Sequence, residues 1–175
     1  MIETLYQKQI QTPVGPMTII GNQDHIYRID YGTIDDLQAA YETWTNKHFT
    51  TVTIHQASPT ELNHVEHQLN EYFNGERTLF DLSFQPLGTP FQAKVWKELY
   101  EIPFGETRTY KDLAIQIDKP KAVRAIGGAV NKNPLSIILP CHRVIGSNGK
   151  LVGYNGGLDK KQFLLQHENI ATPAL

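Results

Sequence analysis

The sequence predicts an α/β (α+β) protein of two small domains, and three observations support this prediction. Alternating apolar and polar residues dominate the start of the chain, helical spacing dominates its second half, and turn-forming residues up to Pro90 separate the two patterns. The 175 residues suffice for one large or two small domains with a buried core. We therefore expect a small sheet with a helix in residues 1–86 and a helix-turn-helix-like domain in residues 87–175.

Three strands are expected to open the first domain. Residues 6–10 and 17–20 alternate and are separated by the turn-forming residues 12–16, which predicts a hairpin. A third strand, residues 26–31, follows a polar turn.

A helix is expected to follow these strands and to start at Ser58. Ser58 can act as the N-cap, Pro59 suits the first helical position, and Glu61 completes a capping box. Residues 80–84 then alternate like a strand before the boundary near Pro90.

Two helices of the second domain are expected to begin at threonine caps. Thr89 precedes Pro90 at the first helical position, and Thr109 precedes Asp112 at the third. A further helix, residues 121–131, should turn three apolar side chains inward, namely Val123, Ile126 and Val130.

The two helices that start at Thr109 and at residue 121 give a helix-turn-helix outline, which is weak evidence for DNA binding when taken alone. Four cations in or beside the second helix strengthen it: Lys119, Lys121, Arg124 and Lys132. The net charge of −2 also hides an asymmetry, because residues 1–90 carry −7 and residues 91–175 carry +5. A basic half within an acidic chain fits a module that meets a polyanion, although charged surfaces are more often merely solvated.

Composition limits location and covalent chemistry. No apolar run approaches a membrane span, and the start of the chain lacks a secretory pattern, so we expect a cytoplasmic protein with no membrane partner. A single cysteine cannot form an internal disulfide or a Cys-rich zinc site.

That cysteine, Cys141, follows an apolar, strand-like run at residues 135–139. A lone cysteine is more often a small buried hydrophobe, but a neighbouring donor or cation such as His142 or Arg143 favours the reactive thiolate. A thiol hydrolase that pairs Cys141 with His142 is disfavoured, because adjacent residues of an extended segment point to opposite sides.

The last helix is expected over residues 159–167. It should pack Phe163, Leu164 and Leu165 inward and end at Glu168, a carboxylate that would be exposed by default.

Residues 140–144, Pro-Cys-His-Arg-Val, resemble the active-site signature of the O6-alkylguanine-DNA alkyltransferases. Further motifs resemble the family in order and spacing across the second half of the chain: Phe104-Gly105-Glu106 with Tyr110, residues 120–128 with Arg124, Asn133-Pro134, and residues 154–168. The first half resembles the family's N-terminal domain more loosely. The resemblance implies a C-terminal winged helix-turn-helix-like domain that binds DNA and carries the active site.

For function, the resemblance implies stoichiometric transfer of a methyl or alkyl group from O6-alkylguanine, flipped out of double-stranded DNA, onto Cys141. O4-alkylthymine is a further candidate substrate. The transfer would inactivate the protein irreversibly, without a cofactor or a required protein partner. No metal is expected, because the zinc ligands of some family members have no full counterpart in a chain whose only cysteine is the acceptor. His142 with Glu168 would take the thiol proton through a bridging water, and Tyr110 would help to rotate the nucleotide and donate to the departing base.

The resemblance also implies residues that contact DNA: Thr109, Tyr110, Lys121, Arg124, Ala125, Gly128 and Asn133. Arg124 would fill the gap left by the extruded base, and Asn133 would brace the active-site turn. The Val144 carbonyl and the Tyr154–Asn155 backbone would read guanine. Asn155 stands where some members have serine and Ser136 where some have proline, so lesion preference depends on two positions expected to line the pocket.

Two readings from other classes remain open. One is a binding module that recognises alkylated bases without removing the group, as do related proteins with tryptophan at the acceptor position; Cys141 argues against it. The other is a winged-helix regulator with an inert cysteine, which would bind a specific DNA sequence and leave the thiol unmodified.

Overall fold

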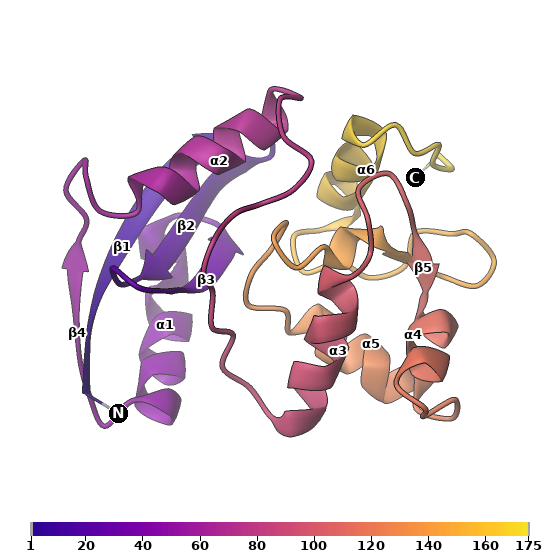
Figure 1. Cartoon of the computed structure of the whole chain (residues 1–175), viewed down its shortest axis with the longest axis horizontal. Helices are drawn as coiled ribbons and strands as arrows, with labels where there is room; N and C mark the ends of the chain where they lie inside the picture. Colours follow the sequence, from indigo (N-terminus) through magenta and orange to yellow (C-terminus); the bar gives the residue numbers. More distant parts are fainter. Residues whose placement is uncertain (1, 175) are drawn as a thin grey trace. The chain divides into compact units, whose positions relative to one another are not determined.

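The computed structural model describes residues 2–174. The chain forms two compact units, the first ending at Leu87 and the second beginning at Gly88 (Figure 1). The first is a sheet with helices and the second is mainly helical, so the predicted mixed α/β class is confirmed. Among residues 2–174, no helix combines the length and the apolar character needed to cross a membrane.

A four-stranded sheet forms the framework of the first unit. Its strands are β1 (Ile2–Thr12), β2 (Gly15–Gly21), β3 (Ile26–Tyr31) and β4 (Thr51–Gln56), in the order β3-β2-β1-β4. The hairpin of β1 and β2 and the third strand were predicted, and both are confirmed. β4 was not predicted; it pairs parallel to β1 at the sheet edge.

Helices cover both faces of this sheet. Helix α1 (Ile34–His48), which was not predicted, packs Tyr41 and Trp44 against a core that includes Leu5 of β1. Lys8 lies three positions after Leu5 on the same strand, so its side chain points to the other face of the sheet. There its ammonium group lies 3.1 Å from Glu66 of α2 (Asn63–Phe73). Every residue of β2 from Met17 onward is therefore buried.

Two expectations for the first unit were wrong in detail. Helix α2 begins at Asn63 instead of Pro59, because Leu62 takes a φ of 61° and interrupts any helix that starts earlier. The contact between Ser58 and Glu61 does form, but it closes a turn before the helix. Residues 80–84 form no strand; only Phe84 makes a bridge, with Ile26.

The second unit contains α3 (Pro90–Tyr100), α4 (Tyr110–Gln116), α5 (Val123–Asn131) and α6 (Leu158–His167). The predicted caps form, since Thr89 accepts from the Gln92 N–H and Thr109 from the Asp112 N–H. Helices α4 and α5 follow one another across a short turn, which confirms the helix-turn-helix outline.

A two-stranded parallel sheet joins distant parts of the second unit. Strand β5 (Arg108–Thr109), just before α4, pairs with β6 (Val144–Ile145), just after the cysteine. The start of the helix-turn-helix is therefore held beside the segment that carries Cys141 (Figure 1).

Four expectations for this unit were also wrong. Helix α5 begins at Val123 instead of residue 121, and Val123 is 39% exposed; Phe163 of α6 is equally exposed. Residues 135–139 form buried turns instead of a strand, with Ile137 at a φ of 74°. A continuous apolar run signals burial, and here burial comes without extended backbone.

Candidate active site

Cys141 is presented by two consecutive tight turns. Its N–H donates to the Leu139 carbonyl at 2.7 Å, and Pro140 between them has φ −79° and ψ 65°, the geometry of an inverse γ-turn. The ring of proline favours such a φ value. Cys141 then begins a 3₁₀ turn, Cys141–Arg143, so the extended segment expected here is wrong.

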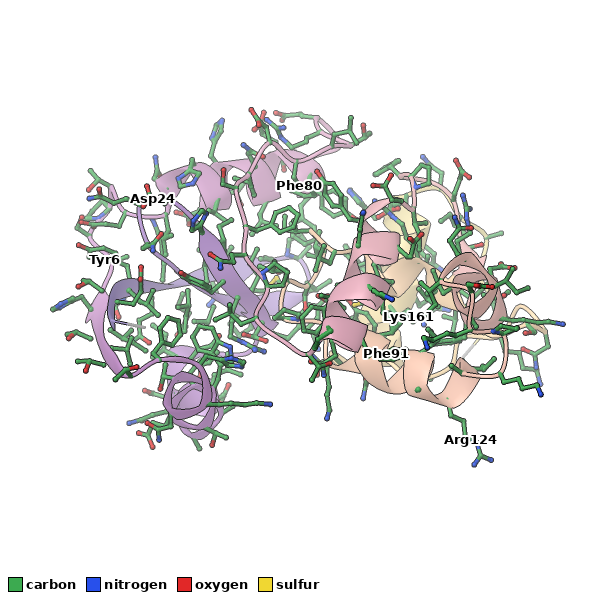
Figure 2. All side chains as sticks on the ribbon, turned by 60° about the horizontal axis from the view of Figure 1, so that its bottom comes forward. Tyr6, Asp24, Phe80, Phe91, Arg124 and Lys161 are labelled. Carbon is green, nitrogen blue, oxygen red and sulfur yellow. The ribbon has the colours of Figure 1, made fainter. Side chains whose placement is uncertain are left out.

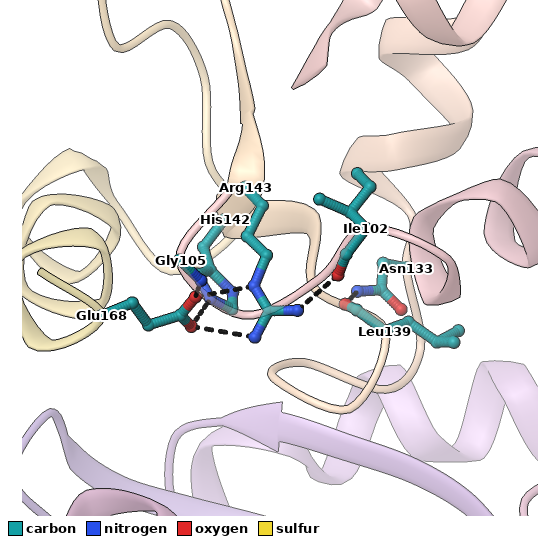
Figure 3. Close-up of polar contacts among 7 residues, drawn as sticks. All are labelled: Ile102, Gly105, Asn133, Leu139, His142, Arg143 and Glu168. Carbon is teal, nitrogen blue, oxygen red and sulfur yellow. Dashed lines mark hydrogen bonds and ion pairs between the residues drawn. The ribbon is translucent and has the colours of Figure 1, made fainter. Parts of the chain in front are cut away.

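Asn133 fixes this turn from the end of α5. Its Nδ2 donates to the Leu139 carbonyl at 2.6 Å (Figure 3). The same Nδ2 donates to the Cys141 sulfur at 3.0 Å, while Oδ1 accepts from the Leu135 N–H at 2.9 Å. One buried amide thus holds both the backbone before the cysteine and the thiol itself.

The thiol opens onto a cavity of about 390 Å³, a volume within the usual range for a small-molecule site. The cavity is lined from α4, α5, the cysteine turn and the loop after β6, by Tyr110, Gly127, Gly128, Val130, Asn131, Cys141, Val152, Gly153, Tyr154 and Asn155. A Cβ added at Gly127 or Gly128 would meet no atom within 4 Å. The two glycines therefore leave the wall beside α5 open.

Behind the cysteine lies a buried polar triad of His142, Arg143 and Glu168 (Figure 3). His142 Nε2 lies 2.6 Å from one Glu168 oxygen, and Arg143 donates through Nε at 2.7 Å and Nη2 at 3.1 Å. The Gly105 N–H also donates to Glu168, at 3.2 Å, and Arg143 Nη1 donates to the Ile102 carbonyl at 2.6 Å. Glu168, which would be exposed by default at a helix end, is only 2% exposed.

The environment sets the protonation states of this triad. Burial lowers the pKa of His142 below its ordinary value of 6.5, and the Glu168 contact opposes this only in part. Burial alone would raise the pKa of Glu168, but the hydrogen bonds and charges of His142 and Arg143 outweigh it and lower that pKa. Glu168 is therefore ionised and His142 neutral.

A neutral His142 that donates from Nε2 to Glu168 keeps a lone pair on Nδ1. That nitrogen is buried and has no hydrogen-bond partner among residues 2–174. The arrangement provides a proton acceptor that is oriented by a carboxylate.

The thiol itself is controlled differently from what the sequence suggested. Burial is the largest influence and raises the pKa of the Cys141 thiol. The Asn133 hydrogen bond, the charge of Lys161 and a Tyr154 hydrogen bond act in the opposite direction. His142 and Arg143, expected to favour the thiolate as sequence neighbours, instead make their hydrogen bonds to Glu168.

Most residues expected around the substrate lie near the thiol. Tyr110, Tyr154 and Asn155 line the cavity, and the Tyr110 hydroxyl donates to the Val152 carbonyl at 3.1 Å. Val144 is buried just after the cysteine turn. Ser136 does not line the cavity as expected: it is fully buried, and its hydroxyl has no partner among the described residues.

The residues expected to contact DNA divide into an exposed and a buried set. Lys121, Arg124, Ala125 and Gly128 are exposed on or beside α5, and Figure 2 shows Arg124 extending outward from that helix. Thr109 is half-buried because it caps α4, whereas Asn133 is 1% exposed. The exposed set forms one helix surface next to the cavity wall, while Asn133 lies beneath it.

The sequence interpretation missed Lys161, whose side chain is fully buried in the second unit. A signal was present, because Lys161, Leu164, Leu165 and Glu168 occupy positions i, i+3, i+4 and i+7 of α6, and all four are buried. Two charged residues on an apolar stripe are unusual unless they have buried partners.

Comparison with known proteins supports one family along nearly the whole chain. A model described as "6-O-methylguanine DNA methyltransferase, ribonuclease-like domain" matches residues 1–86. A second, described as "6-O-methylguanine DNA methyltransferase, DNA binding domain", matches residues 90–170 and so includes the cavity and the triad.

Individual relatives agree with these matches. The methylated-DNA–protein-cysteine methyltransferase of Methanosarcina barkeri is 45% identical over 94% of this chain and 97% of its own length. The crystal structure of the Mycobacterium tuberculosis O6-methylguanine methyltransferase superposes with a TM-score of 0.78 at 41% identity, covering 98% of this chain and 96% of that one. A structure of the M. tuberculosis protein OGT in complex with DNA gives a TM-score of 0.75 at 38% identity, covering 97% and 96% of the two chains.

Proposed function

We infer the function from one premise: the chain belongs to the 6-O-methylguanine DNA methyltransferase family. It repairs DNA by moving the methyl or alkyl group of O6-alkylguanine onto the sulfur of its own Cys141, once and irreversibly. The observation that carries this proposal is a thiol at the wall of a cavity of about 390 Å³, in the unit that matches the family's DNA-binding domain.

The reaction is a displacement at a saturated carbon. The sulfur bonds to the alkyl carbon while the bond from that carbon to O6 breaks, and the electron pair of the broken bond stays on the base. The thiol loses its proton, the base gains one and returns as guanine, and the protein keeps a thioether. No step regenerates the thiol, so each chain acts once.

His142 and Glu168 supply the path for the thiol proton. A water between the Cys141 sulfur and the unpartnered Nδ1 of His142 would relay the proton, and the ionised Glu168 stabilises the imidazolium that forms. We assign to Tyr110, which lines the cavity, the donation of a proton to the departing base.

The target base is stacked inside a duplex, so the protein must extrude it at a cost of a few kcal/mol. We assign the filling of the resulting gap to Arg124, which is exposed on α5 beside the cavity. Phosphate and sugar contacts are assigned to the surrounding surface, namely Thr109, Lys121, Ala125 and Gly128. A protein that searches for damage in any sequence depends mainly on such backbone contacts.

Within the cavity, the Val144 carbonyl and the Tyr154–Asn155 backbone are assigned to recognise the guanine edge. Asn133 braces the turn that presents Cys141, as its hydrogen bonds to the Leu139 carbonyl and to the sulfur support. The cytoplasmic location expected from the sequence is part of the same proposal.

The central test is a single-turnover reaction with duplex DNA that contains one O6-methylguanine. Guanine should be restored with one methyl per protein chain, and transfer should stop when the protein is exhausted. Mass spectrometry should place the methyl on the tryptic peptide from Asn133 to Arg143, which contains the chain's only cysteine. Cys141→Ala should bind the damaged DNA and transfer nothing.

Three outcomes would contradict the proposal. Clearance of excess lesion by little protein would indicate a hydrolase. Binding of the lesion without thiol modification would indicate a recognition module, and a preference for a DNA sequence over a lesion would indicate a regulator.

A further inference from the structure

Lys161 is a fully buried cation whose partners are backbone carbonyl groups. Its ammonium group donates to the Val144 carbonyl, and to the Val152 and Gly153 carbonyls at 3.3 Å each. No carboxylate among residues 2–174 forms an ion pair with it. A lysine is seldom buried without a counter-ion, since burial removes the hydration of its charge.

The three carbonyls belong to two separate segments, of which only the second lines the cavity. Val144 begins β6, directly after the turn that carries Cys141, whereas Val152 and Gly153 lie in the loop that lines the cavity. The ammonium group, which projects from α6, therefore connects the cysteine segment to this loop.

Aromatic rings and the thiol surround the same charge. The ammonium nitrogen lies 6.0 Å from the Tyr110 ring centroid and 5.9 Å from that of Tyr154, both of which line the cavity. The titratable groups that interact with Lys161 are Cys141, His142 and these two tyrosines. Of these, only the Cys141 thiolate would bring a negative charge at neutral pH.

The electrostatic influence between Lys161 and Cys141 is mutual. Burial lowers the pKa of Lys161 to about 8, and a negative Cys141 raises it. Conversely, the charge of Lys161 lowers the pKa of Cys141 against the effect of burial. Charge on the ammonium and charge on the sulfur therefore stabilise each other in a site that excludes water.

Lys161 and Tyr110 both donate hydrogen bonds to the Val152 carbonyl. The Tyr110 hydroxyl donates to the Val152 carbonyl, and a hydroxyl has a single proton to donate. When Tyr110 turns that proton toward the departing base, the Val152 carbonyl keeps only Lys161 as a donor among the contacts described here.

We propose that Lys161 is a positioning residue for alkyl transfer, which holds the Val144 and Val152–Gly153 carbonyls around the cavity and supplies the buried positive charge against which the Cys141 thiolate forms. This inference rests on the proposed function, because it assigns Lys161 a part in that same transfer.

The test uses Lys161→Gln, which can still donate a hydrogen bond but carries no charge, and Lys161→Met, which removes both. Lys160→Met, which removes the neighbouring half-buried lysine of the same helix, is the matched control. The first measurement is the alkylation rate of Cys141 by iodoacetamide across pH, which needs no DNA. The second is single-turnover methyl transfer from duplex DNA at saturating protein.

Both Lys161 variants should shift the midpoint of the pH dependence of Cys141 alkylation upward by about one pH unit. At any pH well below the midpoint, this means ~10-fold less thiolate. Methyl transfer at neutral pH should slow by ~10-fold or more, while DNA affinity stays within ~3-fold, since the charge acts on the transition state and not on binding. Lys160→Met should match the unmodified protein in both assays.

An unshifted alkylation midpoint in folded Lys161→Gln overturns the proposal, because the charge of Lys161 would then have no effect on the thiol. Slower transfer in such a variant would be a result of altered packing. Thermal unfolding establishes which variants are folded, and Lys161→Gln decides the outcome if Lys161→Met does not fold. Failure of the proposed function has a different signature: the unmodified protein would transfer no methyl, whatever the variants do to the thiol.

Discussion

Each unit of the molecule contains a largely buried arginine–carboxylate pair together with a third polar side chain. In the first unit, Arg28 donates to Asp30 through Nε and Nη2, both at 2.8 Å, and the Tyr41 hydroxyl donates to the same carboxylate at 2.8 Å. In the second, Arg143 and His142 approach Glu168 in the same way. The two clusters have nearly the same composition and geometry.

They differ in the third side chain and in what lies next to it. Burial, followed by the charge of Asp30, raises the pKa of Tyr41, so its proton stays on the hydroxyl and is used in the hydrogen bond to Asp30. His142 is neutral, and its Nδ1 is unpartnered among the described residues, one position along the chain from the thiol. The comparison teaches that a buried ion pair by itself is structural, and that a reactive site also needs an available atom beside a nucleophile.

The largest expected effect separates the two carboxylates. Glu168→Gln should slow alkyl transfer by ~100-fold, the usual range for loss of acid–base assistance, while leaving DNA affinity nearly intact. Asp30→Asn should leave transfer within ~2-fold. Both should lower the free energy of unfolding, by about 3–5 kcal/mol for Glu168 and about 2–3 kcal/mol for Asp30, because Arg143 or Arg28 loses a charged partner. Arg28 is the more exposed arginine, which reduces its cost.

Denaturant unfolding and single-turnover kinetics on folded protein would measure both quantities. If Glu168→Gln is too unstable to assay, His142→Phe removes the proton acceptor while keeping the Arg143–Glu168 pair. Equal loss of transfer in Asp30→Asn and Glu168→Gln would mean that the two clusters act alike, through stability alone.

Arg124 extends the comparison beyond the buried clusters, because it is an exposed cation to which we assign a contact with DNA. Arg124→Ala should reduce repair of duplex DNA by ~10-fold and leave the reaction with free O6-methylguanine base nearly unchanged, since the free base needs no extrusion. Lys119→Ala removes another exposed cation near α5 and should weaken only the affinity and its salt dependence.

Transfer rates at saturating protein and DNA affinities at several salt concentrations would distinguish Arg124→Ala from Lys119→Ala. Equal losses of Arg124→Ala on duplex and on free base would remove the gap-filling role. Binding that does not respond to salt would count against the α5 surface as the DNA contact.

The smallest expected effect concerns pH. Because the folded-state pKa of His142 lies below 6.5, the unfolded chain takes up this proton first as pH falls. The stability contributed by neutral His142 is therefore fully present above pH 6.5 and is lost below it, by at most about 1.4 kcal/mol per pH unit. Glu168, with its lowered pKa, keeps its contribution above pH 4.5 and loses it only at lower pH.

Unfolding titrations of the unmodified protein and of His142→Gln would isolate this contribution, since the difference between their slopes just below pH 6.5 belongs to His142. In the transfer rate, the loss that belongs to His142 should likewise begin only below pH 6.5, whereas titration of the Cys141 thiol, whose pKa is raised, acts at higher pH. A decline above pH 6.5 that is present in the unmodified protein and absent from His142→Gln would mean that His142 is protonated in the folded protein.

The sequence by itself determined the features that depend on neighbours along the chain. Alternation and a turn specified the hairpin of β1 and β2, and the threonine caps specified where α3 and α4 begin. The motif around Cys141 indicated the family, which the comparisons confirm. Local rules failed where the backbone took left-handed values, at Leu62 before α2 and at Ile137 before the cysteine.

Apart from the relay that the family resemblance implied, the tertiary structure alone decided which polar groups meet. Glu168 lies 26 residues from His142 in sequence, and no spacing along the chain indicates that the two lie 2.6 Å apart. The spacing of Lys161 with Leu164 and Leu165 placed it on an apolar stripe, but only the packed helix shows that its ammonium group meets backbone carbonyls. The physical reason is that hydrogen bonds between distant residues depend on how helices pack, and a charge beside a thiol matters only after packing has excluded water from both.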